Sequence, residues 1–466
     1  MMPRQSAMAG TLQALLLFLV APFATPWAPP SSTRRAASLT LRATRAPKFF
    51  EADSIIDVRV DSLSSLGDGV GRVRSNLTGS DVVVFVQFAA PGDVVRARVT
   101  EEKKRSCRAA VVEVLEPSPD RAVPRCPSFG LKEGACGGCQ LQHLTLDAQR
   151  RWKRVFLRDA LERVGGLRGV AVEATRGGDR GYGYRRKLTP HVTARGALGF
   201  QRVGGRGLVD VAACAIADDA VNDRLRALAA EPRDRLLARA AAYAPARRAR
   251  AKKAPAGGTL LLRGHAAGVA VDPDEVVEQR VRGLRFAHKA SEFWQNNDDA
   301  LPALVDHVVA EARRSGATKL LDCYCGGGLF ALAAAADFAE VRGVEVSAAN
   351  VAAATRNAAR NGLGGVATFV VGRAERLFAD AAEFAGGDTV VVMDPPRAGA
   401  SAAFLDQLLA FGPVRVVYVS CDPATLARDA AALVAGGDYA VASAVPFDLF
   451  PMTRHVEAVV CFDRTG

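Results

Sequence analysis

The second half of the chain alternates apolar strand-like runs with alanine-rich helical stretches, and this alternation restricts the fold more than any other feature. Strands that alternate with helices form a mostly parallel sheet with helices on both faces. From residue 283 to residue 466, the sequence therefore predicts an α/β, Rossmann-like domain whose ligand sites lie beyond the carboxyl ends of the strands. The strand-like runs are residues 318–322, 341–345, 389–394, 414–420 and 456–462.

Residues 48–117 differ in texture, with five short β-rich runs separated by turns that contain glycine and aspartate. One of these turns reads L-G-D-G-V-G-R over residues 66–72. Five strands in so short a segment predict a small, OB-like β-barrel. The basic residues 103–105 are expected at the rim of this barrel, either in contact with RNA phosphate or as a solvated turn.

Residues 118–282 are expected to form a central α+β domain that carries the clustered cysteines. Cys126, Cys136 and Cys139 share one stretch rich in glycine and proline, and Cys214 lies downstream. Three close thiols and one remote thiol suit either an iron–sulfur cluster or zinc. Nine cysteines in 466 residues are too few for a disulfide scaffold. The isolated cysteines are expected to be bystanders or small buried side chains: Cys107, Cys323, Cys325 and Cys461.

An insertion rich in alanine, arginine and proline interrupts this central region at residues 231–258. We expect it to be exposed and helical in its first half, either as an RNA contact or as a solvated linker. The whole chain has a formal net charge of +12, but the surplus is uneven. Residues 48–282 contain 41 basic and 28 acidic residues, whereas residues 283–466 contain 15 basic and 21 acidic residues. We therefore expect residues 48–282 to hold most of any RNA phosphate.

Residues 1–47 read as a targeting presequence. The apolar run at residues 12–20 is shorter than the roughly 20 residues that cross a bilayer, so it indicates a signal segment. An Arg/Ser-rich stretch follows, and the first acidic residue of the chain is Glu51. This arrangement resembles the two-part presequence of secondary plastids, with a secretory signal or delivery to the mitochondrion as alternatives. No later segment has the apolar length of a membrane span, so the mature protein is expected to be soluble.

The segment L-D-C-Y-C-G-G-G-L-F at residues 321–330 reads as a strand, a glycine-rich turn and the start of a helix. Glycines at such a turn let the backbone approach a ligand closely. Glu345 ends the next apolar run, where a carboxylate can accept both hydroxyls of a ribose. The spacing does not follow G-x-G-x-x-G, and Asp394 begins a D-P-P-R segment at the end of a later run. S-adenosylmethionine is therefore a better candidate cofactor than a nicotinamide dinucleotide.

Cys421 lies in the segment S-C-D-P-A-T-L-A-R-D, where an apolar run turns into a helix. A thiol near a helix N-terminus is expected to have a lowered pKa and to act as a nucleophile. Glu457 closes the segment F-P-M-T-R-H-V-E and enters the last apolar run. A carboxylate at that place can act as a general base.

These segments together resemble bacterial-type RNA uracil-5-methyltransferases. Residues 48–117 resemble a TRAM domain, an RNA-binding barrel, and with the cysteine cluster they are most similar to the 23S rRNA members. The resemblance implies that Cys421 adds to C6 of uracil, that C5 takes the methyl group of S-adenosylmethionine, and that Glu457 removes the C5 proton. The positions that it places at the cofactor are Gln295 (in F-W-Q-N-N), Tyr324, Gly326, Gly328, Glu345 and Asp394.

The resemblance also implies a 4Fe–4S cluster on Cys126, Cys136, Cys139 and Cys214, with a role in structure and RNA positioning rather than in electron transfer. The nine residues between Cys126 and Cys136 exceed the usual spacing of the family. Residues 181–187, G-Y-G-Y-R-R-K, are similar to a family segment that can stack a base and hold its phosphate, with a solvated basic strand as the alternative. Two positions depart from the family pattern, which leaves their cofactor contacts open: Leu329 and Arg373.

The expected partner is structured RNA, with organellar 23S rRNA first and the T-loop uridine of tRNA as the alternative, bound by a monomer. A non-catalytic RNA-binding or RNA-folding factor is the alternative from a different class. The presence of Cys421, Asp394 and Glu457 argues against it, because a binding module has no need of a nucleophile and a base. A DNA or cytosine methyltransferase requires a different context around its nucleophile.

Overall fold

The computed structural model describes nine segments of the chain. They are residues 49–51, 53–131, 135–193, 196–205, 207–247, 258–372, 379–384, 387–436 and 439–465. The predicted presequence and Arg373 lie outside these residues, as does part of the 231–258 insertion. Within the described part of the chain, no helix has the length and apolar character needed to cross a membrane.

The first described strands form a closed barrel, as the sequence predicted. β3 and β5 pair in parallel, whereas the other neighbours are antiparallel, and β4 returns to β1 to close the ring. Alternate side chains such as Val82, Val84 and Val86 are buried, as the two-residue period of a strand requires. The strands, in the order β1-β2-β3-β5-β4, are β1 (Ile55–Leu63), β2 (Asp68–Arg74), β3 (Asp81–Gln87), β5 (Ser106–Glu116) and β4 (Val94–Glu102).

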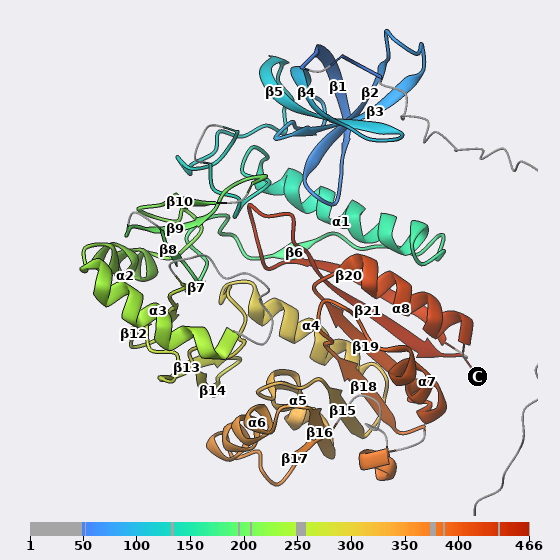
Figure 1. Ribbon diagram of the computed structural model, residues 1–466. Helices are drawn as coiled ribbons and strands as arrows, with labels where there is room; N and C mark the ends of the chain where they lie inside the picture. Colours follow the sequence, from blue (N-terminus) through green and yellow to red (C-terminus); the bar gives the residue numbers. More distant parts are fainter. Residues whose placement is uncertain are drawn as a thin grey trace, which may run out of the picture. The chain divides into compact units, whose positions relative to one another are not determined.

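The second half of the chain contributes seven strands to an eight-stranded sheet (Figure 1). The strands from β17 to β19 are parallel, and β21 runs antiparallel to both of its neighbours. The strand order reverses between β15 and β18, which is where an open α/β sheet binds its ligand. In spatial order the strands are β17 (Ala367–Val371), β16 (Glu340–Glu345), β15 (Lys319–Cys323), β18 (Thr389–Met393), β19 (Arg415–Ser420), β21 (Glu457–Arg464), β20 (Tyr439–Asp448) and β6 (Arg176–Gly177).

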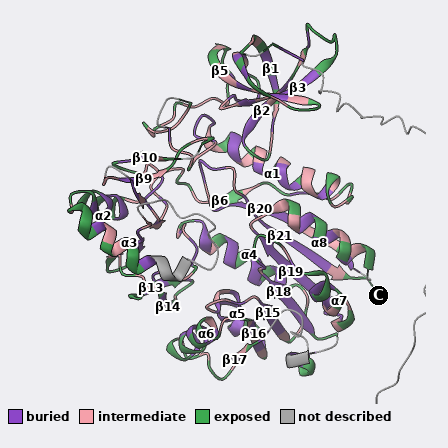
Figure 2. Cartoon of the chain, viewed as in Figure 1, coloured by how far each residue is buried: buried purple, intermediate pink, exposed green. Residues whose placement is uncertain are grey.

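Helices cover both faces of this sheet, and its central strands are buried (Figure 2). Along β18, Val390 and Val392 belong to one apolar cluster and Val391 and Met393 to the other, so this central strand contributes to a core on each face of the sheet. The Rossmann-like architecture predicted from the alternation is therefore confirmed. The first cluster includes α4 (Leu301–Arg313), α5 (Leu329–Ala334) and α6 (Ala348–Arg360); the second includes α7 (Ala402–Phe411) and α8 (Pro423–Gly436); short 3-10 turns lie at Ala335–Asp337 and Ala379–Phe384.

Part of the middle region also belongs to the layers of this sheet. α1 (Leu146–Arg163) places Leu157 and Leu161 in the same apolar cluster as Leu426 and Leu433 of α8. β6 extends the sheet by pairing with β20. The expected boundary between residues 282 and 283 falls in the turn of a hairpin formed by β13 (Val276–Val281) and β14 (Leu284–Lys289).

The remainder of the middle region contains two small sheets and two helices. α3 includes the first half of the 231–258 insertion, as expected, but that half is not wholly exposed. Leu236, Ala240 and Tyr243 lie on one helical face and are at most 4% exposed, because that face packs on the small sheets. The elements are β7 (Lys187–Leu188), β8 (His191–Val192), β9 (Leu198–Gln201), β10 (Leu208–Asp210), α2 (Asp219–Ala229), α3 (Arg233–Arg247), β11 (Leu262–His265) and β12 (Gly268–Ala270).

Candidate functional site

The sheet brings together the two residues that the sequence singled out for catalysis. Ser420 at the end of β19 pairs with Ala458 of β21, so Cys421 lies just beyond β19, beside Glu457 at the start of β21. The two side chains also interact electrostatically: Glu457 raises the pKa of Cys421, and Asp394 raises the pKa values of both Cys421 and Glu457. A thiol and two carboxyl groups therefore share one end of the sheet.

The protonation state of Cys421 differs from the expectation. Burial raises the pKa of its thiol to about 11, and Glu457 and Asp394 add to this effect. The helix N-terminus does not offset it, because Asp422 caps α8 instead: its Oδ1 accepts hydrogen bonds from Ala424 N (3.0 Å) and Thr425 N (3.1 Å). The expected lowering of the thiol pKa is therefore wrong for the protein without ligands.

Arg397 is the group that opposes this rise. Its guanidinium lowers the pKa of Cys421 through its charge and a side-chain hydrogen bond, and it also lowers that of Glu457. Arg397 is the last residue of the D-P-P-R segment, for which the sequence predicted a role only at Asp394. Its position in the sequence could have indicated this role, because it follows Asp394 by only three residues and therefore lies at the same end of the sheet.

The two carboxyl groups at this edge are hard to ionise. Burial raises the pKa of Asp394 to about 7, and burial followed by the charge of Asp394 raises that of Glu457 well above its usual range. Glu457 is 3% exposed. Neighbouring carboxyl groups with raised pKa values resist losing both protons, which is a common property of catalytic sites.

A third and a fourth carboxyl group lie at the glycine-rich turn after β15. Glu345 accepts hydrogen bonds from Gly326 N (3.2 Å) and Ser347 N (2.9 Å). Asp322 is fully buried; its Oδ2 accepts from Ala331 N (2.9 Å), whereas its Oδ1 has no partner among the described residues. Burial raises the pKa of Asp322 to about 8, with smaller contributions from Asp394 and Glu345. This acidic edge suits a ligand that carries hydroxyl groups and positive charge.

The turn itself is shaped for close approach. Gly326 and Gly328 have positive φ angles of 53° and 87°, and so does Tyr324, at 64°. A Cβ atom on Gly328 would lie 3.1 Å from the ring of Phe369. The Tyr324 ring packs 5.3 Å from that of Phe404, and Leu329 packs on the apolar core under the sheet.

Gln295 is 6% exposed and belongs to a segment that the fully buried Arg263 holds in place. The Arg263 guanidinium donates hydrogen bonds to the carbonyl oxygens of Glu292 (2.9 Å), Ala290 (3.4 Å) and Trp294 (3.4 Å). Sequence reasoning missed Arg263, because an arginine in a short β-strand gives no sign that its partners lie near residue 292.

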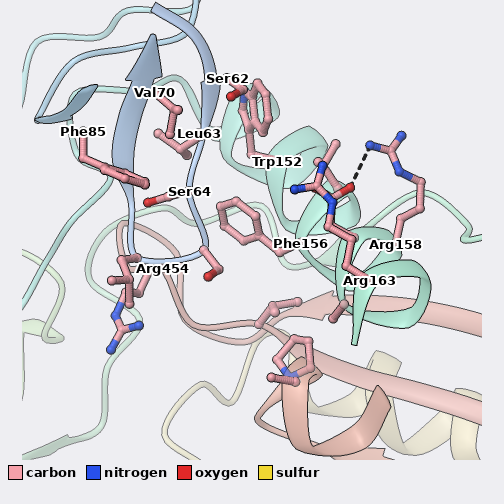
Figure 3. A pocket seen from close by; sticks show the side chains of 18 of the residues that line it. Ser62, Leu63, Ser64, Val70, Phe85, Trp152, Phe156, Arg158, Arg163 and Arg454 are labelled. Carbon is pink, nitrogen blue, oxygen red and sulfur yellow. Dashed lines mark hydrogen bonds and ion pairs between the residues drawn. The ribbon is translucent and has the colours of Figure 1, made fainter. Parts of the chain in front are cut away.

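A cavity of about 960 Å³ opens between the barrel and α1 (Figure 3). Cys421 is among the residues that line it. Phe85 and Leu63 line it from the barrel, and Trp152 and Phe156 from α1. This volume is at the upper end of the roughly 300–1,000 Å³ typical of small-molecule pockets, so the cavity has room for a large substrate group beside Cys421. Its arginines are Arg72, Arg158, Arg163 and Arg454.

A second cavity of about 350 Å³ is lined by all four cysteines of the predicted cluster, Cys126, Cys136, Cys139 and Cys214. Burial raises the pKa of Cys139 to about 12 and also raises those of Cys136 and Cys214, and nearby thiols add to each shift. Among the described residues, however, no group of three or more His, Cys, Asp or Glu side chains is arranged to hold a metal ion.

His455 lines both cavities, and burial lowers its pKa to about 4, with a further contribution from Arg397. It is therefore a neutral side chain between the cysteine-lined cavity and Cys421. The F-P-M-T-R-H-V-E segment that carries it thus touches both sites.

The Tyr/Arg segment at residues 181–187 is less available than expected. Tyr184 is 3% exposed, and its hydroxyl donates a hydrogen bond to Pro451 O (2.9 Å). Arg186 forms ion pairs with Asp218 (2.5 Å) and Asp298 (3.0 Å). A base cannot stack on the buried Tyr184 ring, so that part of the expectation is wrong.

Comparison with protein families gives two matches. A model of the tRNA (uracil-5-)-methyltransferase family matches residues 250–465, and a model of the TRAM domain matches residues 53–112. The first covers the sheet and the candidate site, and the second covers the barrel.

Two named relatives match most of the chain. A tRNA (uracil(54)-C(5))-methyltransferase of Schizosaccharomyces pombe is 34% identical over 442 residues, which cover 89% of this chain and 79% of the relative. A 23S rRNA (uracil(1939)-C(5))-methyltransferase of Alkalilimnicola ehrlichii is 32% identical over 446 residues, which cover 88% of this chain and 96% of the relative.

Among solved structures, the fold is similar to that of a Pyrococcus abyssi tRNA (uracil-54, C5)-methyltransferase crystallised with S-adenosyl-L-homocysteine. The TM-score is 0.63 at 23% identity, and the match covers 87% of this chain and 100% of that one.

Proposed function

Because the chain belongs to the RNA uracil-5-methyltransferase family, we propose that it methylates C5 of a uridine in structured RNA, with Cys421 as nucleophile and Glu457 as base. The observation that carries this assignment is the position of the two side chains. The β19–β21 register brings them side by side at one end of the sheet, and Cys421 lines the cavity of about 960 Å³.

S-adenosylmethionine fits the acidic edge of the sheet, where it would supply an electrophilic methyl group. Glu345 lies at the end of β16, where a carboxylate can accept ribose hydroxyls. Burial raises the pKa values of Asp322, whose Oδ1 is unpartnered among the described residues, and of Asp394, and a sulfonium cation beside these carboxyl groups would favour their ionised forms. Gly326, Gly328 and the buried Gln295 would complete the set.

The chemistry explains why a thiol and a carboxylate are needed. The Cys421 thiolate adds to C6 of uracil, which forms an S–C6 bond and makes C5 an enolate-type nucleophile able to accept a methyl group. Glu457 then removes the C5 proton, and the S–C6 bond breaks with its electrons returning to sulfur. A buried, easily protonated Glu457 is suited to this proton transfer.

The covalent step is tested with RNA that carries 5-fluorouridine, because fluorine cannot leave as a proton and the adduct is trapped. We expect a stable protein–RNA adduct that mass spectrometry maps to Cys421. Cys421→Ala should form none, whereas Cys107→Ala, which removes a buried thiol of the barrel, should form it normally. An adduct that persists in Cys421→Ala would refute the assignment.

We propose 23S rRNA of an organelle as the substrate, supported by the combination of TRAM barrel and cysteine-lined cavity. The T-loop uridine of tRNA is the second candidate, since the S. pombe and P. abyssi relatives are named for it. Mapping of 5-methyluridine in rRNA and tRNA from cells with and without the protein distinguishes them. Loss of the modification from tRNA alone would exclude the rRNA proposal.

We propose a 4Fe–4S cluster on Cys126, Cys136, Cys139 and Cys214, supported by the donor set, since four thiols line one cavity. Anaerobically purified protein should contain about four irons and four sulfides per chain. Cys214→Ser should lose them and Cys107→Ala keep them; zinc without sulfide would refute the cluster.

We also propose that residues 1–47 deliver the protein to a plastid, supported by their apolar run and their lack of acidic residues. A fluorescent protein fused behind these residues should enter the plastid in an alga with secondary plastids. Accumulation in the mitochondrion would contradict the proposal.

A further inference from the structure

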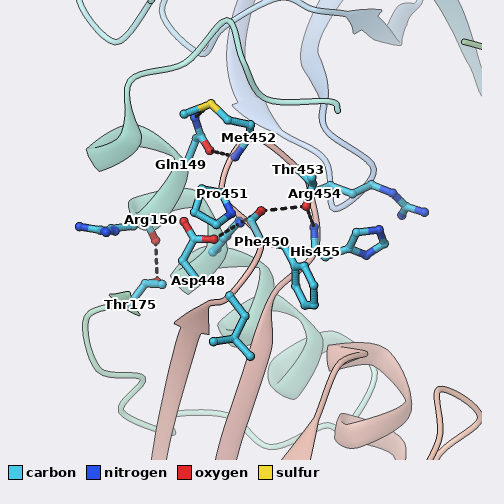
Figure 4. A network of polar contacts seen from close by, with 12 residues as sticks. Gln149, Arg150, Thr175, Asp448, Phe450, Pro451, Met452, Thr453, Arg454 and His455 are labelled. Carbon is cyan, nitrogen blue, oxygen red and sulfur yellow. Dashed lines mark hydrogen bonds and ion pairs between the residues drawn. The ribbon is translucent and has the colours of Figure 1, made fainter. Parts of the chain in front are cut away.

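Two polar residues on the buried face of α1 hold the loop that leads to Glu457, and Figure 4 shows one of them, Gln149, beside Met452 of this loop. Gln149 and Lys153 lie one helical turn apart, and both are fully buried. Glutamine and lysine are seldom fully buried unless they have partners. Gln149 Nε2 donates one hydrogen bond to the nearby Leu144 O (2.9 Å), and the other partners of the two residues belong to residues 448–456, about 300 positions later in the chain.

Lys153 fixes the start of this loop. Its ammonium donates to Asp448 Oδ1 (2.5 Å) and to Phe450 O (3.0 Å), and neither Lys153 nor Asp448 has exposed side-chain surface. Asp448 is the last residue of β20 and directly follows Phe447, which pairs with Glu457 across the β20–β21 ladder. The buried ion pair therefore adjoins the strand position that carries the proposed base.

Gln149 fixes the tip of the loop. Its Oε1 accepts a hydrogen bond from Met452 N (2.8 Å), and its Nε2 donates to Met452 Sδ (3.3 Å) (Figure 4). Met452 has a φ angle of 68°, a strained backbone for a residue with a side chain. Its carbonyl also accepts from Gln140 N (3.2 Å) and Leu141 N (3.0 Å), next to Cys139. Hydrogen bonds to both the backbone N–H and the carbonyl of Met452 stabilise this unfavourable conformation.

We propose that Gln149 and Lys153 are positioning residues for proton removal: they hold the 448–456 loop so that Glu457 lies beside Cys421. The inference rests on the proposed function of Glu457. Neither residue contacts the reacting atoms, so both act only through the loop. They serve the second half of the reaction, in which Glu457 takes the C5 proton and the S–C6 bond breaks.

If Gln149 and Lys153 had a purely structural role, their loss would affect both halves of the reaction. Measuring the two half-reactions separately therefore distinguishes a structural role from a positioning role. Adduct formation with 5-fluorouridine RNA reports only the addition and methyl-transfer steps, whereas turnover on ordinary RNA also requires proton removal. A displaced base slows turnover alone, and a methylated protein–RNA adduct then accumulates. General loss of structure slows both reactions together and accumulates nothing.

The test uses the full chain with Gln149→Leu and Lys153→Met. We expect turnover on ordinary RNA to fall roughly tenfold to a hundredfold, as small misplacement of a catalytic group does, with a denaturant-resistant adduct on ordinary RNA. The rate of adduct formation with 5-fluorouridine RNA should stay within about twofold of the unmodified protein, since that rate does not need the base. Lys153→Arg, which keeps the charge, should restore part of the turnover.

Arg151→Met is the matched control, because it removes another basic residue of α1 whose ion pair with Asp120 lies at the surface. It should leave both rates unchanged. Lys153→Met leaves Asp448 as an unpaired buried charge, which can prevent folding. Gln149→Leu removes no charge, so it tests the proposal even if Lys153→Met does not fold. Equal losses in both rates for Gln149→Leu, or no loss in either, would overturn the proposal. Absence of any adduct in the unmodified protein would instead refute the proposed function.

Discussion

At the scale of single residues, the state of the Cys421 thiol is set by burial and by three neighbours that the fold brings together: Glu457, Asp394 and Arg397. Burial, Glu457 and Asp394 raise the pKa of the thiol to about 11, and Arg397 lowers it. The free protein therefore keeps its nucleophile protonated at neutral pH. Positive charge that arrives with the cofactor would act in the same direction as Arg397 and favour the thiolate.

This balance predicts the reactivity of Cys421 in the protein without ligands. Alkylation by iodoacetamide requires the thiolate, so its rate should rise roughly tenfold per pH unit below the pKa. Arg397→Leu should slow it, because the group that lowers the pKa is gone. Mass spectrometry of the Cys421 peptide gives the rate. Arg313→Leu, at an exposed ion pair on α4, is the control, and an unchanged rate in Arg397→Leu would contradict the prediction.

Glu457 leads to a second prediction at this scale. A base accepts a proton only when it is ionised, and burial and Asp394 raise the pKa of Glu457 well above its usual value of 4.5. Turnover should therefore fall as pH falls through this raised pKa, and covalent adduct should accumulate on the acid side. Asp394→Asn should move the acid limb of the residual activity to lower pH, since it removes a negative charge beside Glu457. A limb that moves to higher pH would be inconsistent with this coupling.

At the scale of elements, the sequence predicted those features that depend on residues close to one another in the chain. The glycine-rich turn after β15 and the placement of Glu457 at the start of β21 are local, and strand alternation fixes their end of the sheet. The contacts of Lys153 with Asp448, 295 positions apart, and of Arg263 with the segment before Gln295 depend on tertiary packing. No local pattern marks them, and for the same reason the burial of Tyr184 was missed.

α3 provides a prediction at the element scale. Its sequence is rich in alanine and arginine, yet Leu236 is fully buried against the small sheets of the middle region. Leu236→Ala should lower the free energy of unfolding by about 2–5 kcal/mol, because it leaves a cavity in that cluster. Arg235→Ala, at an exposed position of the same helix, should change it by less than about 0.5 kcal/mol. Urea denaturation measures both, and equal effects would mean that α3 does not pack as described.

At the scale of the whole molecule, the distribution of charge and the packing of the elements place the boundary between the two parts of the chain at different residues. The basic surplus lies in residues 48–282 and the acidic surplus in residues 283–466. α1 and β6, however, belong to the basic part and pack into the layers of the eight-stranded sheet. A fragment cut at residue 283 would expose the apolar face of α8 that α1 covers. RNA binding by the basic part is therefore best measured in the full chain.

The turn between β4 and β5 offers that measurement, because residues 103–105 are exposed there and carry three of the basic side chains. If they contact RNA phosphate, replacing Lys103, Lys104 and Arg105 by alanine should weaken binding and reduce the slope of log Kd against log salt by roughly two, since each phosphate contact contributes roughly 0.7–0.9. Arg356→Ala with Arg360→Ala, on the exposed face of α6 in the acidic part, should leave the slope unchanged. An unchanged slope in the triple variant would mean that the turn is only solvated and that phosphate is held elsewhere in residues 48–282.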